Sequence, residues 1–217
     1  MSEKIKVLNL YACLGGNRLL WDNCDVMAVE LDPELARLYS ERFPQDTVII
    51  ADAHQYLLDH YKEFDFIWSS PPCPSHSRIR YSQSKNSCNE KFKPVYPDMT
   101  LYQEIIFLQN YYHGKYCVEN VIPYYEPLIA AQKRGRHLYW CNFILPQKLS
   151  NRTEKISGKN EFKQLCDFHK IDISQYHGNQ RKDKIARNLV DYEAGLTIYN
   201  IAMNIMKKQD LIQTTLF

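Results

Sequence analysis

One cysteine stands in a stiff, proline-rich frame within the stretch DFIWSSPPCPSHS. Proline fixes φ and donates no backbone hydrogen bond, so Pro71, Pro72 and Pro74 are poor residues for a central strand but suit a rigid loop around Cys73. Most cysteines are simply small buried hydrophobic residues. A thiol that is held rigidly near cationic groups has the properties of a nucleophile, because such groups lower its pKa toward neutrality. This frame therefore predicts a nucleophilic Cys73.

Glycines and carboxylates elsewhere in the chain indicate a ligand that carries a nucleoside. Gly15 and Gly16 follow an apolar run and would let a ligand approach the backbone, while Glu30 could accept hydrogen bonds from two ribose hydroxyls. Asp52 could accept a hydrogen bond from an adenine amino group. It could equally cap a helix that begins at Ala53. The glycine pair falls short of the GxGxxG fingerprint, so by itself it also fits an ordinary turn.

Short β-branched or aromatic runs alternate with helical patterns and would position these residues. The predicted strands are 6–11, 26–30, 47–51, 64–69, 116–120 and 138–145, and the predicted helices are 33–43, 53–61 and 99–112. The alternation predicts an α/β fold, with a doubly wound parallel sheet covered on both faces. Ligands bind beyond the carboxyl ends of such strands. Glu30, Asp52, Cys73 and Glu119 all follow predicted strand ends and are expected to meet at one edge.

Length and composition favour one intracellular domain. The 217 residues suffice for a single domain with a full core. The seven cysteines are scattered without CxxC spacing, which argues against a disulfide framework or a zinc ribbon and favours a reduced, cytoplasmic protein. The first residues, MSEKIKVLNLY, lack an apolar stretch of signal-peptide length, and no run of about eighteen apolar residues occurs. We expect neither secretion nor a membrane span.

The net charge of +2 hides two basic segments. Residues 147–187 hold ten Lys or Arg against five acidic residues, and residues 78–93 hold five against one. Solvated polar loops are the common role of such runs, and a surface that follows nucleic-acid phosphates is the alternative. The candidate DNA-binding cations in the first segment are Arg78, Arg80, Lys85, Lys91 and Lys93.

Several motifs, taken in order, resemble those of the cytosine carbon-5 DNA methyltransferases, which use S-adenosylmethionine. YACLGG (11–16) is similar to the family's FxGxGG, VELD (29–32) to its ribose segment, ADA (51–53) to its adenine segment, PPC (71–73) to its nucleophile loop, ENV (119–121) to its acid motif and QxRxR (132–136) to its arginine motif. RNLVDYEAGLTI (187–198) resembles the closing GNxVxxP segment. The resemblance covers most of the chain apart from roughly 145–185.

The resemblance implies a Rossmann-like class I methyltransferase domain over 1–217, with a small basic target-recognition insert at 146–186. Cys73 would add to carbon 6 of a cytosine flipped out of DNA, and Glu119 would bind ring nitrogen 3. Arg136, with Arg134 behind it, would bind the base carbonyl and help hold the thiolate. The reaction requires no metal and converts S-adenosylmethionine into S-adenosylhomocysteine. The implied cofactor-binding residues are Tyr11, Ala12, Gly15, Gly16, Glu30, Leu31, Asp52, Ala53, Pro72, Asn188 and Val190.

Some positions depart from the family pattern. Cys13 replaces a glycine of the cofactor loop. Pro74 and His76 replace the usual glutamine and aromatic residue after PPC. Two alternatives stay open: an RNA cytosine methyltransferase of the same family, and a catalytically inactive protein that binds DNA or a sliding clamp. A monomer is expected.

The C-terminal tail, residues 209–217, ends in QTTLF. This peptide resembles the QLxLF motif by which bacterial replication and repair proteins bind the sliding clamp. Gln213, Leu216 and Phe217 are its candidate clamp-binding residues, with the two apolar side chains anchored in a pocket of the partner. A tail that packs against its own core is the alternative.

Overall fold

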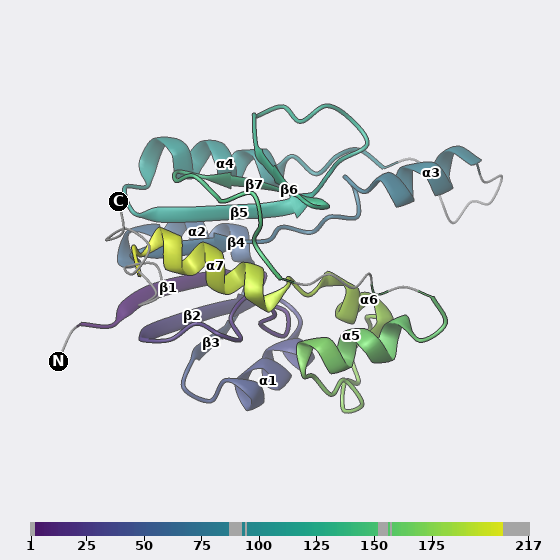
Figure 1. The fold of residues 1–217 in the computed structure, drawn as a ribbon, viewed down its shortest axis with the longest axis horizontal. Helices are drawn as coiled ribbons and strands as arrows, with labels where there is room; N and C mark the ends of the chain where they lie inside the picture. The colour runs from purple at the N-terminus through teal and green to yellow at the C-terminus, as the bar shows by residue number, and fades with distance from the viewer. Residues whose placement is uncertain (1–2, 87–92, 94, 152–155, 157, 206–217) are drawn as a thin grey trace, which may run out of the picture.

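The computed structural model describes residues 3–86, 93, 95–151, 156 and 158–205. At its centre is a seven-stranded sheet with the order β3-β2-β1-β4-β5-β7-β6 (Figure 1). The strands are β1 (Ile5–Leu10), β2 (Cys24–Glu30), β3 (Thr47–Ile50), β4 (Phe66–Ser69), β5 (Lys115–Val121), β6 (Gln132–Arg134) and β7 (His137–Cys141). The first five are parallel, and β7 and β6 complete the edge in antiparallel pairing.

The predicted strands are confirmed to within a few residues at each end, because their burial matches their apolar sequence. The central strand β4 reads FIWS and is buried at every position, as expected for a parallel strand covered on both faces. The polar strand β6, in contrast, reads QKR at the open edge of the sheet. Its sequence carries no strand signal. The strand forms through its pairing with β7.

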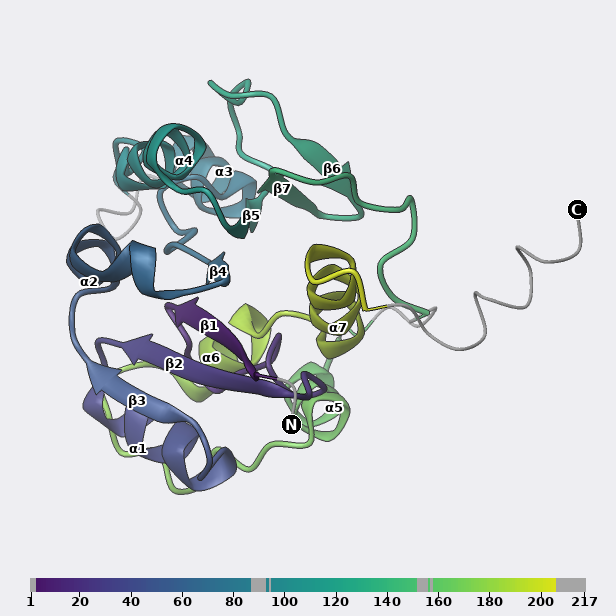
Figure 2. The ribbon, with the colours of Figure 1, turned by 90° about the vertical axis from the view of Figure 1, so that its left-hand side faces the viewer.

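Helices cover both faces of the sheet. They are α1 (Pro33–Arg42), α2 (Ala53–His60), the 3₁₀ turn η1 (Tyr61–Glu63), α3 (Arg78–Asn86), α4 (Thr100–Tyr111), α5 (Glu161–His169), α6 (Lys182–Asn188) and α7 (Tyr192–Ala202). Helices α2 and α4 pack on one face and α7 on the other (Figure 2). In the part of the chain that the structure describes, no helix is long and apolar enough to cross a membrane.

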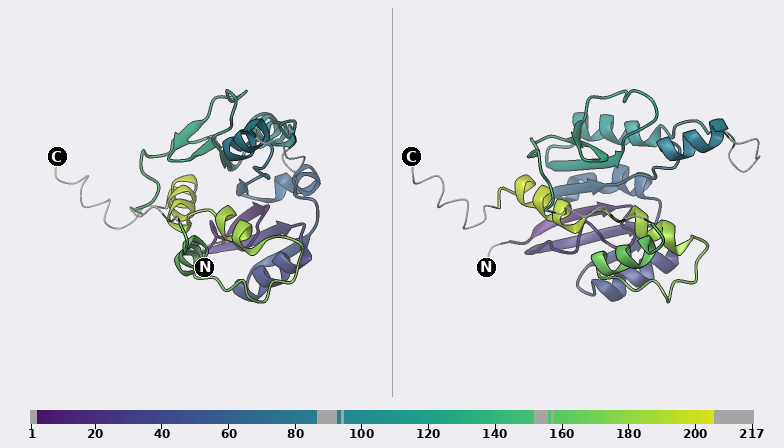
Figure 3. Two further views of the ribbon diagram at one scale, coloured as in Figure 1. Left: turned by 90° about the vertical axis from the view of Figure 1, so that its right-hand side faces the viewer. Right: turned by 45° about the vertical axis from the view of Figure 1, so that its right-hand side comes forward.

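The segment predicted as a target-recognition insert at 146–186 packs against the α/β core from residue 161 onward. Helices α5 and α6 lie beside α1 (Figure 3) and share an apolar cluster with it. The guanidinium of Arg42 ties the two parts together, because it donates to the carbonyl oxygens of both Leu14 and His169 at 2.6 Å. This segment therefore extends the wall behind the loop that follows β1.

The first part of the basic segment 78–93 is a helix, whereas solvated polar loops are the common role of such basic runs. Residues 78–86 form helix α3, which projects from the body of the molecule (Figure 1). The helix is anchored at its start, where Arg78 Nε donates to the carbonyl oxygen of Pro123 at 2.9 Å and Ser77 forms an isolated β-bridge with Pro123. Its cations thus extend beyond the edge of the sheet at which Cys73 lies.

Candidate active site

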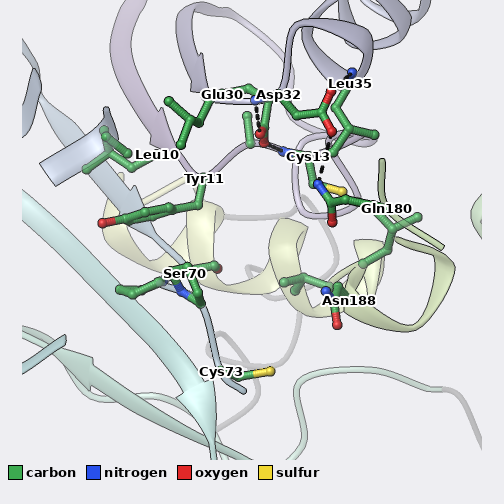
Figure 4. Close-up of a pocket in the computed structure, with 18 of the residues that line it drawn as sticks. Leu10, Tyr11, Cys13, Glu30, Asp32, Leu35, Ser70, Cys73, Gln180 and Asn188 are labelled. Atoms are coloured by element: carbon green, nitrogen blue, oxygen red, sulfur yellow. Dashed lines mark hydrogen bonds between the residues drawn. The ribbon is translucent and has the colours of Figure 1, made fainter. Parts of the chain in front are cut away.

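One cavity of about 1030 Å³ opens at the carboxyl ends of the parallel strands β1 to β5. Glu30, Asp52, Cys73 and Glu119 all line it, which confirms that the four strand ends meet at one edge of the sheet. Figure 4 shows Glu30 and Asp32 on one side of this cavity and Cys73 on the other. Ligand pockets in proteins typically measure about 300–1,000 Å³. This cavity therefore has room for a cofactor and part of a second molecule.

The buried carboxylate of Glu30 fixes the loop after β1. It accepts hydrogen bonds from the backbone N–H groups of Cys13 at 2.8 Å and of Asp32 at 2.9 Å (Figure 4). Burial raises the pKa of Glu30, and the backbone donors of Asp32 and Cys13 oppose this rise. A carboxylate has about four acceptor positions, so Glu30 retains capacity for a ligand's hydroxyl groups.

The loop between β1 and β2 packs closely against the segment after α6. A Cβ atom on Gly16 would lie 2.5 Å from the carbonyl oxygen of Val190, so only glycine allows this approach. Gly15 has φ +64° and faces the rings of Phe43 and Tyr39, outside the residues that line the cavity. The non-glycine residue Cys13 also has a positive φ, of 48°, at the position where the family motif has glycine.

Asp32 joins the start of α1 to the segment before α6. One carboxylate oxygen caps α1 by accepting from the backbone N–H of Glu34 at 2.9 Å. The other accepts from Tyr176 Oη at 2.7 Å and from Gln180 Nε2 at 3.1 Å. Burial raises the pKa of Asp32, but these donors together outweigh it and leave the pKa lowered. Gln180 also lines the cavity, so this junction forms part of the cavity wall.

The carboxylate of Glu104 on α4 is fully buried and links three segments next to the cavity. Tyr11 Oη donates to Oε1 of Glu104 and Ser69 Oγ donates to Oε2, each at 2.6 Å. His54 Nδ1 lies 3.3 Å from Oε1, and its pKa is raised first by its hydrogen bond with Glu104. Glu104 therefore holds the loop after β1, the end of β4 and the start of α2 in one arrangement.

The loop that carries Cys73 is held by backbone hydrogen bonds. The carbonyl oxygen of Cys73 accepts from the N–H groups of His76 at 3.0 Å and Ser77 at 3.1 Å. Asn120, which follows Glu119 on β5, donates from Nδ2 to the carbonyl oxygen of Pro71 at 3.0 Å. The ENV motif thus fixes the start of the PPC loop directly, which explains why an asparagine follows the acid.

The electrostatic environment of Cys73 differs from the one predicted. Burial and the charge of Glu119 raise the pKa of the thiol, while its own backbone N–H and Lys184 act in the opposite direction. Lys184 of α6 also lines the cavity. The cation that acts on the thiol is therefore a lysine from the basic segment rather than an arginine of the QxRxR motif.

Glu119 is buried and has a histidine as its neighbour. His137 Nε2 lies 3.7 Å from Oε1 of Glu119, across the β5–β7 pairing. His137 lines the cavity and keeps 37% of its side chain exposed. Sequence reasoning did not single out this residue, since a histidine at the start of an apolar strand is usually unremarkable. His137 lies close to Glu119 only because β7 pairs with β5, and the sequence does not specify that pairing.

The two arginines of the hairpin lie outside the residues that line the cavity. Arg134 is engaged with backbone carbonyl oxygens, donating from Nε to Pro146 and from Nη2 to Leu145. Arg136 is exposed at the turn between β6 and β7, next to His137. The contact of either arginine with a base carbonyl stays a prediction. In this arrangement Arg134 instead fastens the hairpin to the segment that follows β7.

Most of the other predicted residues surround the cavity. Its lining includes the following predicted cofactor-binding residues: Tyr11, Ala12, Gly16, Glu30, Leu31, Asp52, Ala53, Pro72, Asn188 and Val190. Asp52 also caps α2 by accepting from the N–H of Gln55 at 2.8 Å, so both readings of this residue remain compatible with its position. Lys91, Gln213, Leu216 and Phe217 lie outside the described residues.

The sequence did not reveal that α6 and the segment before it line the cavity. His177, Gly178, Asn179, Gln180, Lys184 and Arg187 line it together with Asn188. The run HGN at 177–179 has the composition of a turn, but it carries no motif that would have assigned it to the cavity. No three His, Cys, Asp or Glu side chains within the described ranges could hold a metal ion.

Comparison with known structures identifies the fold. A methyltransferase of Entamoeba histolytica, EhMeth, covers 95% of this chain and 100% of its own at a TM-score of 0.51 and 10% identity. A DNMT2 variant of Spodoptera frugiperda is 22% identical over 54% of this chain and 36% of its own, with a TM-score of 0.37. Among the curated proteins, no sequence matches. The sheet and its helices form the Rossmann-like fold of class I S-adenosylmethionine-dependent methyltransferases.

Residues 5–121, just over half of the chain, match the family described as C-5 cytosine-specific DNA methylase. The chain belongs to this family. The matched part of the chain begins at β1 and ends at the ENV motif of β5. It therefore contains the loop after β1, Glu30, the PPC loop and Glu119. The hairpin, the insert and α7 lie beyond the matched part.

The residues that line the cavity fit the cofactor that the fold implies. A buried carboxylate at Glu30 suits ribose hydroxyls, and Asp52 beside Ala53 suits the amino edge of adenine. Gly16 lets Val190 approach the loop after β1, so that both line this end of the cavity. These features match the donor and acceptor groups of S-adenosylmethionine.

Proposed function

We propose that this chain is a DNA cytosine-5 methyltransferase that acts on a flipped-out cytosine through a covalent adduct with Cys73. The observation that carries the proposal is that Cys73 and Glu119 line the same cavity as Glu30 and Asp52. A nucleophile and a base-binding acid are thereby combined with two carboxylates suited to a nucleoside cofactor. Family membership supports the same chemistry.

S-adenosylmethionine, when bound, supplies the methyl group as an electrophile. Glu30 is proposed to accept from the ribose hydroxyls with the acceptor capacity left after its bonds to Cys13 and Asp32. Asp52 is proposed to accept from the adenine amino group through the oxygen that does not cap α2. Asn188 and Val190 close this end of the cavity against the loop after β1.

Cytosine carbon 5 is too electron-poor to attack a methyl sulfonium directly, so the proposed reaction begins with the thiolate of Cys73. The thiolate adds to carbon 6 as protonated Glu119 donates to ring nitrogen 3, which neutralises the charge that develops on the ring. Carbon 5 then attacks the methyl group. Loss of the carbon-5 proton to water, expulsion of the Cys73 thiolate and return of the ring nitrogen 3 proton to Glu119 restore the neutral aromatic ring. No metal is needed in any of these steps.

The position of Glu119 couples its protonation to activation of the thiol. The charge of Glu119 is one of the two causes that raise the pKa of Cys73. A proton on Glu119 removes that cause and at the same time creates the donor that the base requires. His137, 3.7 Å from Glu119, is proposed to deliver this proton. Lys184 is proposed to favour the resulting thiolate.

The substrate strand is proposed to reach the cavity across the basic surface of α3. Arg78, Arg80 and Lys85 extend along this helix, which begins five residues after Cys73. Arg136 is proposed to contact the strand from the exposed turn of the hairpin. Since the described part of 146–186 mainly packs on α1, target reading is proposed to be limited to few contacts.

The proposed function is tested by incubating the purified chain with methyl-labelled S-adenosylmethionine and either DNA or tRNA. We expect label in DNA, recovered as 5-methylcytosine, and no label with a Cys73→Ala variant. Bisulfite sequencing of the DNA would then give the sequence context of the methylated cytosines. Label that enters only tRNA, or no transfer to either substrate, would overturn the proposal in favour of the RNA enzyme or the inactive protein respectively.

We also propose that the terminal QTTLF peptide tethers the chain to a bacterial sliding clamp. Tethering raises the local concentration of the enzyme on replicating DNA, which would compensate for limited target reading. A pull-down with purified clamp should retain the full chain and lose a variant without the last five residues. Equal retention of both would end this proposal.

A further inference from the structure

A second cavity, of about 220 Å³, lies between α3 and the segment after β5. We call it the α3 pocket. It is lined by Ser75, Arg80, Tyr81, Ser84, Lys85, Lys93, Val95 and Tyr124. Pockets that bind drug-sized molecules measure about 300–1,000 Å³. The smaller volume of the α3 pocket therefore suits a single small group, such as one nucleobase or one phosphate.

The chemistry of the α3 pocket combines positive charge with aromatic rings. Among the described residues that line it, three are cations and none is acidic. The rings of Tyr81 and Tyr124 are stacked in parallel, with centroids 4.3 Å apart and planes 4° apart, and Tyr81 keeps 42% of its surface exposed. Positive charge together with an exposed aromatic ring is the combination by which proteins hold single-stranded nucleic acid. The lining thus suits a nucleotide better than an uncharged metabolite.

The α3 pocket is built from the loop that carries Cys73. Ser75 lies two residues after the cysteine, and two residues of chain span at most about 7 Å, which equals about two base steps along a DNA strand. The N–H of Tyr124 donates to the carbonyl oxygen of His76 at 3.1 Å, so the far wall of the pocket is attached to the same loop. The backbone N–H of Asp98, which lines the main cavity, donates to Ser75 Oγ at 2.9 Å.

From this position and chemistry we infer that the α3 pocket binds a nucleotide next to the target cytosine on the same DNA strand. The neighbouring base stacks against Tyr81, while Arg80 and the two lysines face its phosphate. The neighbour is therefore unpaired when the target base is in the main cavity, so the substrate is a single-stranded or locally opened stretch of DNA. This inference rests on the proposed function of the main cavity and specifies its substrate.

The inference is tested by fluorescence anisotropy with labelled single-stranded DNA that contains one cytosine. In a matched series, one nucleotide at a time on either side of the cytosine is replaced by an abasic residue, which removes the base and keeps the phosphate. For the unaltered chain we expect binding to weaken roughly tenfold at one of these positions, since stacking of one base on an aromatic side chain has about this effect. Tyr81→Ala should abolish this dependence on the neighbouring base.

Matched controls separate the pocket from general effects. Tyr111→Ala removes another exposed tyrosine, 61% exposed on α4, and should keep the full effect of the abasic residue. Lys85→Gln should lower the salt dependence of DNA binding, whereas Lys163→Gln on α5 should leave it unchanged. Circular dichroism of each variant verifies that it is folded.

The inference is wrong if no abasic position weakens binding of the unaltered chain, or if Tyr81→Ala and Tyr111→Ala respond to the series alike. It is also wrong if DNA binding by Lys85→Gln and by Lys163→Gln depends on salt to the same extent. Because binding is measured without cofactor, the result is independent of methyl transfer. An intact abasic effect without methyl transfer would therefore refute the proposed reaction while supporting the pocket, and the reverse result would refute the pocket alone.

Discussion

Replacement of Glu104 by leucine should destabilise the protein strongly, because this carboxylate is the common acceptor beneath the cavity. The change leaves the buried hydroxyl groups of Tyr11 and Ser69 without the acceptor that each has at 2.6 Å. An unsatisfied buried hydroxyl costs about 1–3 kcal/mol, so two cost about 2–6 kcal/mol. Removal of a buried charge offsets part of this. We expect a net loss of about 3 kcal/mol in the free energy of unfolding.

Urea denaturation followed by circular dichroism measures this loss. With a dependence of about 2–3 kcal/mol per molar urea for a chain of this size, the midpoint should fall by roughly 1 M. The matched control is Gln103→Leu, which introduces the same side chain at the preceding, exposed position of α4 and should move the midpoint little. If Glu104→Leu shifted the midpoint no more than Gln103→Leu does, Glu104 would not organise the site as argued.

The contribution of His54 to this arrangement should depend on pH. The pKa of His54 is raised in the folded state, first by its hydrogen bond with Glu104, above the value of about 6.5 in the unfolded chain. A raised folded-state pKa gives stability that is full below about pH 6.5 and is lost as pH rises through the folded-state value. Urea midpoints of the unaltered chain and His54→Gln should therefore differ most at acidic pH. A difference that grows toward alkaline pH would contradict this sign.

Three further substitutions test the walls of the main cavity. Gly16→Ala places a Cβ 2.5 Å from the carbonyl oxygen of Val190, so it should lower stability by about 1–3 kcal/mol and weaken cofactor binding by calorimetry. Tyr176→Phe removes a donor to Asp32 and should weaken cofactor binding roughly tenfold while kcat at saturating cofactor is unchanged. His137→Gln keeps a donor near Glu119 but cannot deliver its proton, so kcat should fall at least about 100-fold without loss of stability. Unchanged values in these assays would remove each residue from its assigned role.

The sequence predicted the fold well where local pattern and burial agree. The apolar runs that became β1 to β5 and the capped helices α1 and α2 were found to within a few residues, because parallel strands buried on both faces have distinctive sequences. The predicted start of α1 at residue 33 is confirmed, and in the structure Asp32 caps the helix while Pro33 lies in its first turn. The same reasoning predicted that Glu30, Asp52, Cys73 and Glu119 lie at one edge of the sheet, because parallel strands end on the same side.

The rest depended on contacts between distant segments. Strand β6 has the sequence QKR and forms only because β7 offers a partner. The basic segment after residue 147 suggested a nucleic-acid surface, but apolar positions such as Leu165 and Ile185 turn its described helices onto α1. The short charged helix α6 thereby brings Lys184 into the cavity. Neither charge counting nor motif order reveals that Lys184 lines the same cavity as Cys73.

The central claim is that Cys73 forms a covalent bond with a target cytosine. The most direct measurement is mass spectrometry of the chain after incubation with S-adenosylmethionine and DNA that contains 5-fluorocytosine, where fluorine replaces the proton that must leave. We predict a covalent complex with the peptide that contains Cys73, and none with a Cys73→Ser variant. A chain that methylates DNA but gives no such complex, or a Cys73→Ser variant that still forms it, would contradict the account.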